Sequence, residues 1–341
     1  MKVKPLLHCH LLVTGLFPPM AAAVPRLPAL ESLLAFSGRR ETAETDAEAW
    51  LCQTFGVARQ HDWPVAPFAA LGDGLAPSDE YWLRADPVHF HLLRDRLVVA
   101  DAFDLRTDEA EALIASLNQH FAADGLQFFA PRADRWYLRL ARQPALQTYP
   151  LAEVVGQDAN RLLPQGADAM LWHGRLNEAQ MLLHDHPVNL AREQRGELPI
   201  NSIWPWGAGA LLKPAPSMFA AVWAEDALTL GLAQTSGGAH GLPCSAAEWL
   251  QQSPAHGAHL IVLSDLAKPA LRAHAANWCE ALQAMEQRWF APLLEALKRG
   301  QVASIHLHLA APHQVRSFIT KRNDLWKFWH RPKPWETLFD A

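Results

Sequence analysis

Short apolar runs alternate along the chain with stretches of helical spacing, and this pattern predicts strands separated by helices. Leu6 to Val13 and His259 to Leu263 are short, mainly apolar runs of the kind found in buried strands, although His8 and His10 interrupt the first. Ala220 to Leu232 has the spacing of a helix, and Ala270 to Lys298 continues a helical pattern with a break expected at Pro292. This order indicates an α/β fold with a mainly parallel sheet and helices on both faces.

A different pattern interrupts this alternation between residues 86 and 159. Two alternating runs predict a β-hairpin that turns near Arg94-Asp95, and Thr107 to Phe121 predicts a capped helix. Two further strands are expected at 126–129 and 135–140. A unit of this size is marginal as an independent domain. We therefore predict an inserted α+β lobe at 86–159 and an α/β core formed by residues 1–85 and 160–341.

The stretch from Leu176 to Gly209 combines breaks in helical structure with polar side chains. Pro187 and the segment from Gly196 to Pro199 interrupt it, and a buried strand is expected from Ile200 to Trp206. The candidate ligand-binding residues are an imidazole, two amides and two guanidinium groups, namely His186, Asn189, Asn201, Arg192 and Arg139. A guanidinium fork and a free helix N-terminus both suit a small anion. The alternative is that the asparagines only cap and turn the chain, and that Arg192 is a solvated charge.

The same stretch carries a long motif, formed by His186-Pro187-Val188-Asn189, Arg192, Gly196, Pro199, Asn201, Ile203, Trp204, Trp206, Gly207 and Gly209. Further pieces are Ala85-Asp86-Pro87-Val88-His89, Arg135-Trp136-Tyr137-Leu138-Arg139-Leu140 and Leu162-Leu163-Pro164-Gln165-Gly166. With these motifs the chain resembles bacterial regulatory proteins of the RpfE type and, more distantly, archaeal-type cofactor-independent phosphoglycerate mutases of the alkaline phosphatase superfamily. The resemblance implies an alkaline-phosphatase-like fold with an inserted lobe.

The resemblance also implies a particular chemistry, which can be compared with the residues present. The mutases use two divalent metal ions, held by Asp and His at strand ends, and a serine nucleophile. Where that family has an Asp after the first strand, this chain has Thr14. Asp265 and His274 match a later ligand segment only in part, and Ile305 to Leu309 is followed by no carboxylate. No serine between residues 38 and 79 matches the nucleophile. We therefore expect neither a catalytic residue nor a metal or other cofactor.

Histidine spacing offers a second route to a metal site. His306 and His308 lie two residues apart with His313 nearby, and His8 with His10 and His89 with His91 repeat the spacing. Among 17 histidines such pairs arise often by chance, so we do not predict a metal site from them.

The composition and charge of the chain argue against several classes of function. A net charge of −5 argues against a nucleic-acid partner, and no apolar run approaches the ~18 residues of a membrane span. The four cysteines form no close pair, which favours a reducing cytoplasm. Met1 to Ala23 imitates a secretory signal, but its histidines and its Pro18-Pro19 pair favour a first strand instead.

These observations predict a cytoplasmic regulatory or ligand-sensing protein without catalysis, which binds a small phosphorylated or carboxylated anion. The first alternative is an active isomerase of the phosphoglycerate mutase type, whose metal ligands the spacing does not reveal. The second is a scaffold protein without a ligand. Neither a protein partner nor the oligomeric state follows from the sequence.

Overall fold

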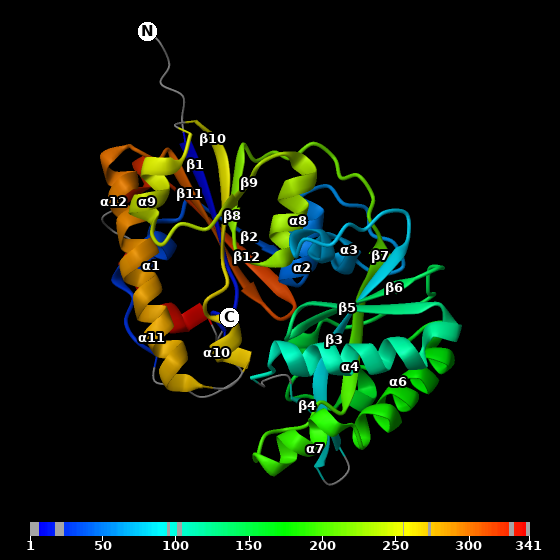
Figure 1. Ribbon diagram of the computed structural model, residues 1–341. Helices are drawn as coiled ribbons and strands as arrows, with labels where there is room; N and C mark the ends of the chain where they lie inside the picture. Colours follow the sequence, from blue (N-terminus) through cyan, green and yellow to red (C-terminus); the bar gives the residue numbers. More distant parts are fainter. Residues whose placement is uncertain are drawn as a thin grey trace. The chain divides into compact units, whose positions relative to one another are not determined.

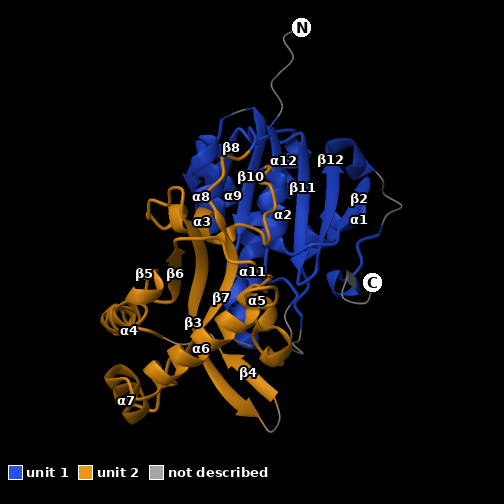
Figure 2. Cartoon of the chain, turned by 90° about the vertical axis from the view of Figure 1, so that its right-hand side faces the viewer, with its two compact units in different colours: residues 1–55, 215–341 blue, residues 56–214 orange. Residues whose placement is uncertain are grey.

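The structure is a computed structural model that describes residues 7–17, 24–93, 96–100, 104–254, 256–271, 274–326 and 331–338 (Figure 1). The chain forms two compact units. Unit 1 consists of residues 1–55 and 215–341, and unit 2 consists of residues 56–214 (Figure 2).

Unit 1 is built on a sheet whose described strands follow the order β2-β12-β11-β1-β10-β8-β9. The bounds are β1 Leu7–Val13, β2 Arg39–Ala43, β8 Ala221–Ala224, β9 Ala239–Gly241, β10 Gly257–Leu263, β11 Ser304–Ala311 and β12 Gln314–Lys321. The strands from β11 to β9 are parallel, while β12 and β2 extend the sheet in the antiparallel sense. The central strand β1 is buried at all positions but one, because both faces of the sheet are covered. The predicted α/β class with a mainly parallel sheet is therefore confirmed.

Helices cover both faces of this sheet. Figure 1 shows α1, α9, α11 and α12 on one face, and α2 with α8 on the other. The bounds in unit 1 are α1 Pro28–Phe36, α2 Ala47–Thr54, α8 Ala227–Ser236, α9 Ala246–Gln252, α10 Ala267–Leu271, α11 Ala275–Met285 and α12 Ala291–Arg299, with short 3₁₀ turns at Arg322–Trp326 and Trp335–Leu338. A π-helical turn at Glu286–Phe290 divides the long predicted helix just before Pro292.

The predicted helix from Ala220 to Leu232 is wrong in its first part. Residues 221–224 form the buried strand β8, and the helix begins only after Asp226. The Asp226 carboxylate accepts a hydrogen bond of 2.8 Å from the backbone N–H of Thr229, so it caps α8. Val222 and Trp223 favour a strand, and the cap fixes the start of the helix.

Unit 2 is an antiparallel sheet with helices packed on it. Its strands are β3 Tyr81–Leu93, β4 Arg96–Ala100, β5 Leu126–Arg132, β6 Arg135–Leu140 and β7 Ser202–Ala210. They follow the order β4-β3-β6-β5, and β7 pairs with β3. Its helices are α3 Val65–Gly72, α4 Thr107–His120, α5 Leu151–Val154, α6 Ala169–His184 and α7 Pro187–Gln194, with 3₁₀ turns at Ala122–Asp124 and Ala159–Arg161. The predicted turn at Arg94-Asp95 lies outside the described residues.

The compact unit is larger than the lobe predicted at residues 86–159. Strand β3 begins at Tyr81, and β7 pairs with it along most of its length. Helices α3 and α6 pack on β7, so residues 56–85 and 160–214 belong to unit 2 rather than to the α/β core. None of the described helices combines the length and the apolar character needed to cross a lipid bilayer.

Candidate functional site

The predicted anion-binding corner lies in unit 2, where α6 ends, α7 begins and the chain enters β7. Asn189 is 1% exposed, and its amide nitrogen donates hydrogen bonds of 2.7 Å to the carbonyl oxygens of Leu183 and Ile200. Its amide oxygen accepts a bond of 2.8 Å from the N–H of Ile200. The side chain therefore ties the end of α6 to the approach to β7. It is buried inside α7, and His186 rather than Asn189 is the N-cap of that helix.

Arg192 occupies the centre of a buried ion-pair cluster. Its Nη1 lies 2.7 Å from Oε2 of Glu109, and its Nε donates to the carbonyl oxygen of Leu198 at 2.9 Å. Arg195 adds a second contact of 2.5 Å to Oε1 of Glu109. Burial opposes ionisation of Glu109, but the N–H of Arg106 and the two guanidinium groups hold its pKa below the usual value. Arg192 is thus a buried, paired charge and not a solvated one.

The other predicted ligand residues also have internal partners. The amide of Asn201 accepts from the N–H of Phe90 at 2.7 Å and donates to its carbonyl oxygen at 2.8 Å. Nδ1 of His186 accepts from the N–H of Val188 at 3.2 Å, and its Nε2 lies 3.0 Å from Oγ of Ser116. Burial lowers the pKa of His186.

Arg139 lies apart from this corner. It is paired with Trp82 across the β3–β6 ladder, whereas Asn201 contacts Phe90 of the same strand β3. Eight residues of strand span roughly 25 Å. Arg139 instead forms an ion pair of 3.1 Å with Glu80. The structure brings His186, Asn189, Arg192 and Asn201 together without Arg139. Binding of an anion by these residues remains a prediction.

Residues from three of the sequence motifs meet in a second buried network. Arg84 forms an ion pair of 2.5 Å with Asp86, and its guanidinium lies 5.2 Å from the ring centres of both Tyr137 and Trp206. Nε1 of Trp206 donates to Asp86 at 2.7 Å, and the Tyr137 hydroxyl donates to Asp73 at 2.6 Å. These contacts join β3, β6, β7 and the end of α3. The motif residues here hold the unit together.

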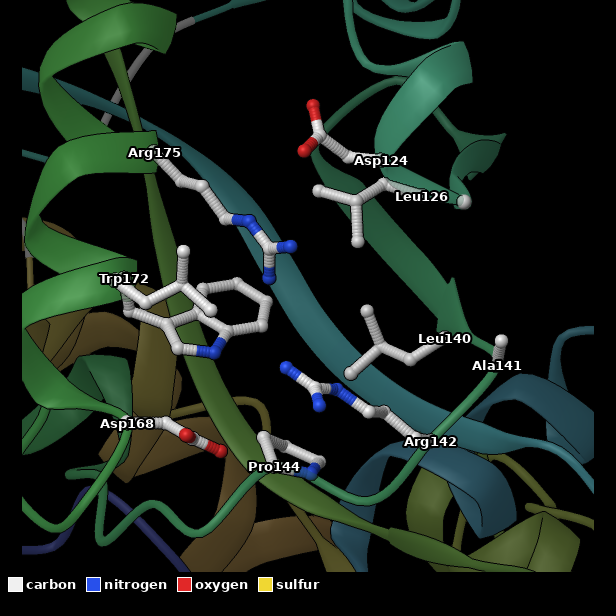
Figure 3. A pocket seen from close by; sticks show the side chains of 11 residues that line it. Asp124, Leu126, Leu140, Ala141, Arg142, Pro144, Asp168, Trp172 and Arg175 are labelled. Carbon is white, nitrogen blue, oxygen red and sulfur yellow. The ribbon is translucent and has the colours of Figure 1, made fainter.

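A cavity of about 130 Å³ opens in unit 2 beside the first two turns of α6 (Figure 3). Figure 3 shows the guanidinium groups of Arg175, from α6, and Arg142, from the loop after β6, pointing into it. Leu126 and Leu140 supply apolar wall on the side of β5 and β6. The sequence did not single out these residues. The available signal was Arg175 beside the buried positions of α6, which include Trp172 and Leu176.

The two arginines of this cavity differ from Arg192 in forming no ion pair, although Asp124 and Asp168 also line the cavity. Within the described chain neither Arg142 nor Arg175 has an ion-pair partner, and the buried Nε of Arg175 has no hydrogen-bond acceptor. The Arg175 guanidinium lies 5.1 Å from the ring centre of Trp172, which holds its plane by a cation–π contact. An unsatisfied buried donor costs about 1–3 kcal/mol. Asp168 is already engaged, since it accepts from the N–H of Ala145 at 2.9 Å.

In unit 1, four histidines gather on neighbouring strands β1 and β11. This histidine cluster consists of His8, His10, His306 and His308. Nδ1 of His10 lies 3.2 Å from Nε2 of His308, and the rings of His10 and His306 stack with centres 4.0 Å apart. Burial and the neighbouring imidazoles lower the pKa of His306 to about 4 and that of His308 to about 3. His10, His306 and His308 are therefore neutral near pH 7.

Comparison with known proteins identifies relatives over part of the chain. No protein-family model matches. A 2,3-bisphosphoglycerate-independent phosphoglycerate mutase of Methanosarcina mazei is 29% identical over 151 residues, or 42% of this chain and 36% of that protein. A probable enzyme of the same name from Geobacter sulfurreducens is 30% identical over 145 residues, or 41% and 36% of the two chains. The chain is a distant homologue of cofactor-independent phosphoglycerate mutases. It matches about a third of the length of these relatives.

A solved structure shares the fold over nearly the whole chain. The PH0037 protein from Pyrococcus horikoshii superimposes with a TM-score of 0.51 and 15% identity, and the match covers 94% of this chain and 88% of that one. The expected fold class thus agrees with both comparisons, whereas the assignment to the RpfE type goes beyond them.

The two metal ions implied by the mutase resemblance do not fit the described residues. At the carboxyl edge of the sheet in unit 1, Thr14 follows β1, Glu225 and Asp226 follow β8, Asp265 follows β10, and Pro312 with an exposed His313 follows β11. A two-metal site requires several carboxylates and imidazoles in reach of one another. No group of three or more such side chains with that geometry occurs in the part of the chain that the structure describes, the histidine cluster included.

Proposed function

We propose that this chain binds a small phosphorylated or carboxylated acid of the kind that phosphoglycerate mutases handle. The observation that carries the proposal is its homology to cofactor-independent phosphoglycerate mutases, which extends over less than half of the chain. We place the protein in the cytoplasm, because the spacing of the four cysteines in the sequence offers no disulfide framework. The proposal has two versions, which differ in whether the bound acid reacts.

In the first version the protein is an isomerase of the phosphoglycerate mutase type. The homology favours it, because the named relatives are mutases. The carboxyl edge of the parallel sheet in unit 1 is the place where ligands of α/β folds bind. Asp265 provides a carboxylate there.

In the second version the protein is a regulatory, ligand-sensing relative of the RpfE type that has no phosphotransfer activity. Thr14 in place of a carboxylate after β1 favours it, since a hydroxyl is a weak ligand for a divalent ion. The shortage of metal-binding groups among the described residues supports it as well.

One set of measurements on the purified full chain separates these versions. The conversion of 3-phosphoglycerate is assayed with and without added manganese, bound metal is quantified, and calorimetry measures binding of the same acid. Turnover with a stoichiometric metal establishes the isomerase, and binding without turnover establishes the sensor. Turnover at the carboxyl edge falls in Asp265→Asn but not in Asp79→Asn, an exposed control in unit 2. Absence of both binding and turnover leaves the scaffold without a ligand and refutes the proposal.

A further inference from the structure

The cavity beside α6 is lined by two arginines that form no ion pair among the described residues, although the carboxylates of Asp124 and Asp168 also line it. Arg142 and Arg175 come from separate elements, and Figure 3 shows both guanidinium groups directed into the same space. A guanidinium group binds carboxylate or phosphate oxygens through several N–H donors at once. Two such groups that converge on one space, with no carboxylate paired to either within the described chain, form an incomplete ion-pair arrangement. An anion completes it.

One N–H donor of Arg175 is buried without a hydrogen-bond acceptor. Nε of Arg175 is shielded from solvent and has no acceptor, although the side chain as a whole is only half-buried. Buried N–H donors in proteins are nearly always satisfied by an acceptor from the protein, water or a ligand. The guanidinium also lies 5.1 Å from the ring centre of Trp172, in a cation–π contact. The guanidinium as a whole points into the cavity, where its other N–H groups can donate to an oxygen atom (Figure 3).

The walls limit what the anion can be. The volume of about 130 Å³ is close to the roughly 150 Å³ of a cavity that holds a single benzene ring. The two leucines on the side of β5 and β6 suit a short carbon chain, and Asp124, which also lines the cavity, can accept a hydrogen bond from a hydroxyl group. The N-terminal end of α6, whose first two turns line the cavity, adds a partial positive charge.

We propose that this cavity in unit 2 is a binding site for a small hydroxy acid, whose carboxylate or phosphate lies between Arg142 and Arg175. The inference rests on the proposed function for the class of ligand, but it assigns the site to unit 2 and not to the carboxyl edge of the sheet in unit 1. The α6–α7–β7 corner, whose polar groups are internally bonded, is not part of this site.

Calorimetry on the full chain tests the site with three probes, 3-phosphoglycerate, glycerate and inorganic phosphate. We expect Arg142→Gln and Arg175→Gln each to weaken binding of the best probe at least tenfold, because each removes a charged donor. Arg175→Lys keeps the charge but not the fork, so it retains part of the affinity. The matched control is Arg161→Gln, which removes the same charge from a side chain of unit 2 that is 86% exposed.

The outcomes separate this inference from the proposed function. Binding of 3-phosphoglycerate that survives both substitutions overturns the cavity assignment and leaves the proposed function standing. Binding of glycerate or phosphate that is lost in both variants, without any binding of 3-phosphoglycerate, supports the cavity and refutes the proposed ligand. The inference is overturned if no probe binds. It is also overturned if Arg142→Gln and Arg175→Gln weaken binding only as much as Arg161→Gln does. Arg142 is exposed, so its substitution keeps the test valid if Arg175→Gln does not fold.

Discussion

Arg192 and Arg175 belong to the same compact unit, yet their guanidinium groups have opposite surroundings. Arg192 is 1% exposed and has Glu109 and two backbone carbonyl groups as partners. Arg175 has an aromatic ring beside it and no acceptor for its buried Nε. Arg192 is fully paired within the fold, whereas the guanidinium of Arg175 has no ion-pair partner among the described residues. An arginine that stands out in a sequence motif can therefore be structural, and an inconspicuous one can point to a site.

The strongest test of this contrast is Arg192→Met. We expect the variant to lose about 3 kcal/mol of the free energy of unfolding, because it breaks a buried ion pair. It also leaves the carbonyl groups of Leu198 and Asp104 without this donor, while Glu109 keeps Arg195. Urea denaturation measures the loss of stability, with Arg161→Gln as the control variant. The prediction of an anion-binding corner requires the reverse result, a loss of ligand affinity with little loss of stability.

Asn189→Ala gives the next largest effect. The substitution removes three hydrogen bonds and leaves buried carbonyl and N–H groups of Leu183 and Ile200 without partners. We expect a loss of about 2–3 kcal/mol in the free energy of unfolding. Thermal and urea unfolding provide the measurement, and Asn177→Ala on the exposed side of α6 provides the control. A change as small as that of the control would contradict the structural role of the Asn189 amide.

These two residues also show what the sequence could and could not predict. The strand at β1 was predictable because a strand covered on both faces is apolar at successive positions. The break before Pro187 was predictable from local backbone chemistry. The bounds of unit 2 were not, since Asp86 and Trp206 meet across 120 positions of the chain and no local pattern reports such a pairing.

The site was harder to predict than the fold, for a physical reason. A polar side chain shows the same donors in sequence whether its partner is a ligand or its own backbone. Asn201, for example, bonds both backbone groups of Phe90. Arg142 and Arg175 were missed because the cavity between them exists only once α6 has packed beside the sheet of unit 2.

The buried histidines of unit 1 differ from both Arg192 and Arg175, because their effect on the free energy of unfolding depends on pH. The folded state binds fewer protons than the unfolded state below the unfolded pKa of about 6.5, because burial lowers the pKa of His308 to about 3. Its contribution to stability is present above pH 6.5 and is lost as the pH falls towards 3. We expect His308→Gln to reduce the loss of stability between pH 6.5 and 4.5 by about 2 kcal/mol. The exposed His61→Gln is the control, and parallel pH profiles for all three proteins would refute the argument.

The smallest expected effect is that of Arg175→Met, and it completes the comparison with Arg192→Met. Removing the guanidinium ends its cation–π contact with Trp172, which stabilises by about 0.5–1 kcal/mol. It also removes a buried donor without an acceptor, whose cost is about 1–3 kcal/mol. The two terms oppose each other, so the free energy of unfolding should change by less than about 1 kcal/mol or rise. Urea denaturation without ligand is the measurement. A loss as large as that of Arg192→Met would show that Arg175 also holds the fold together, and the distinction between the two arginines would fail.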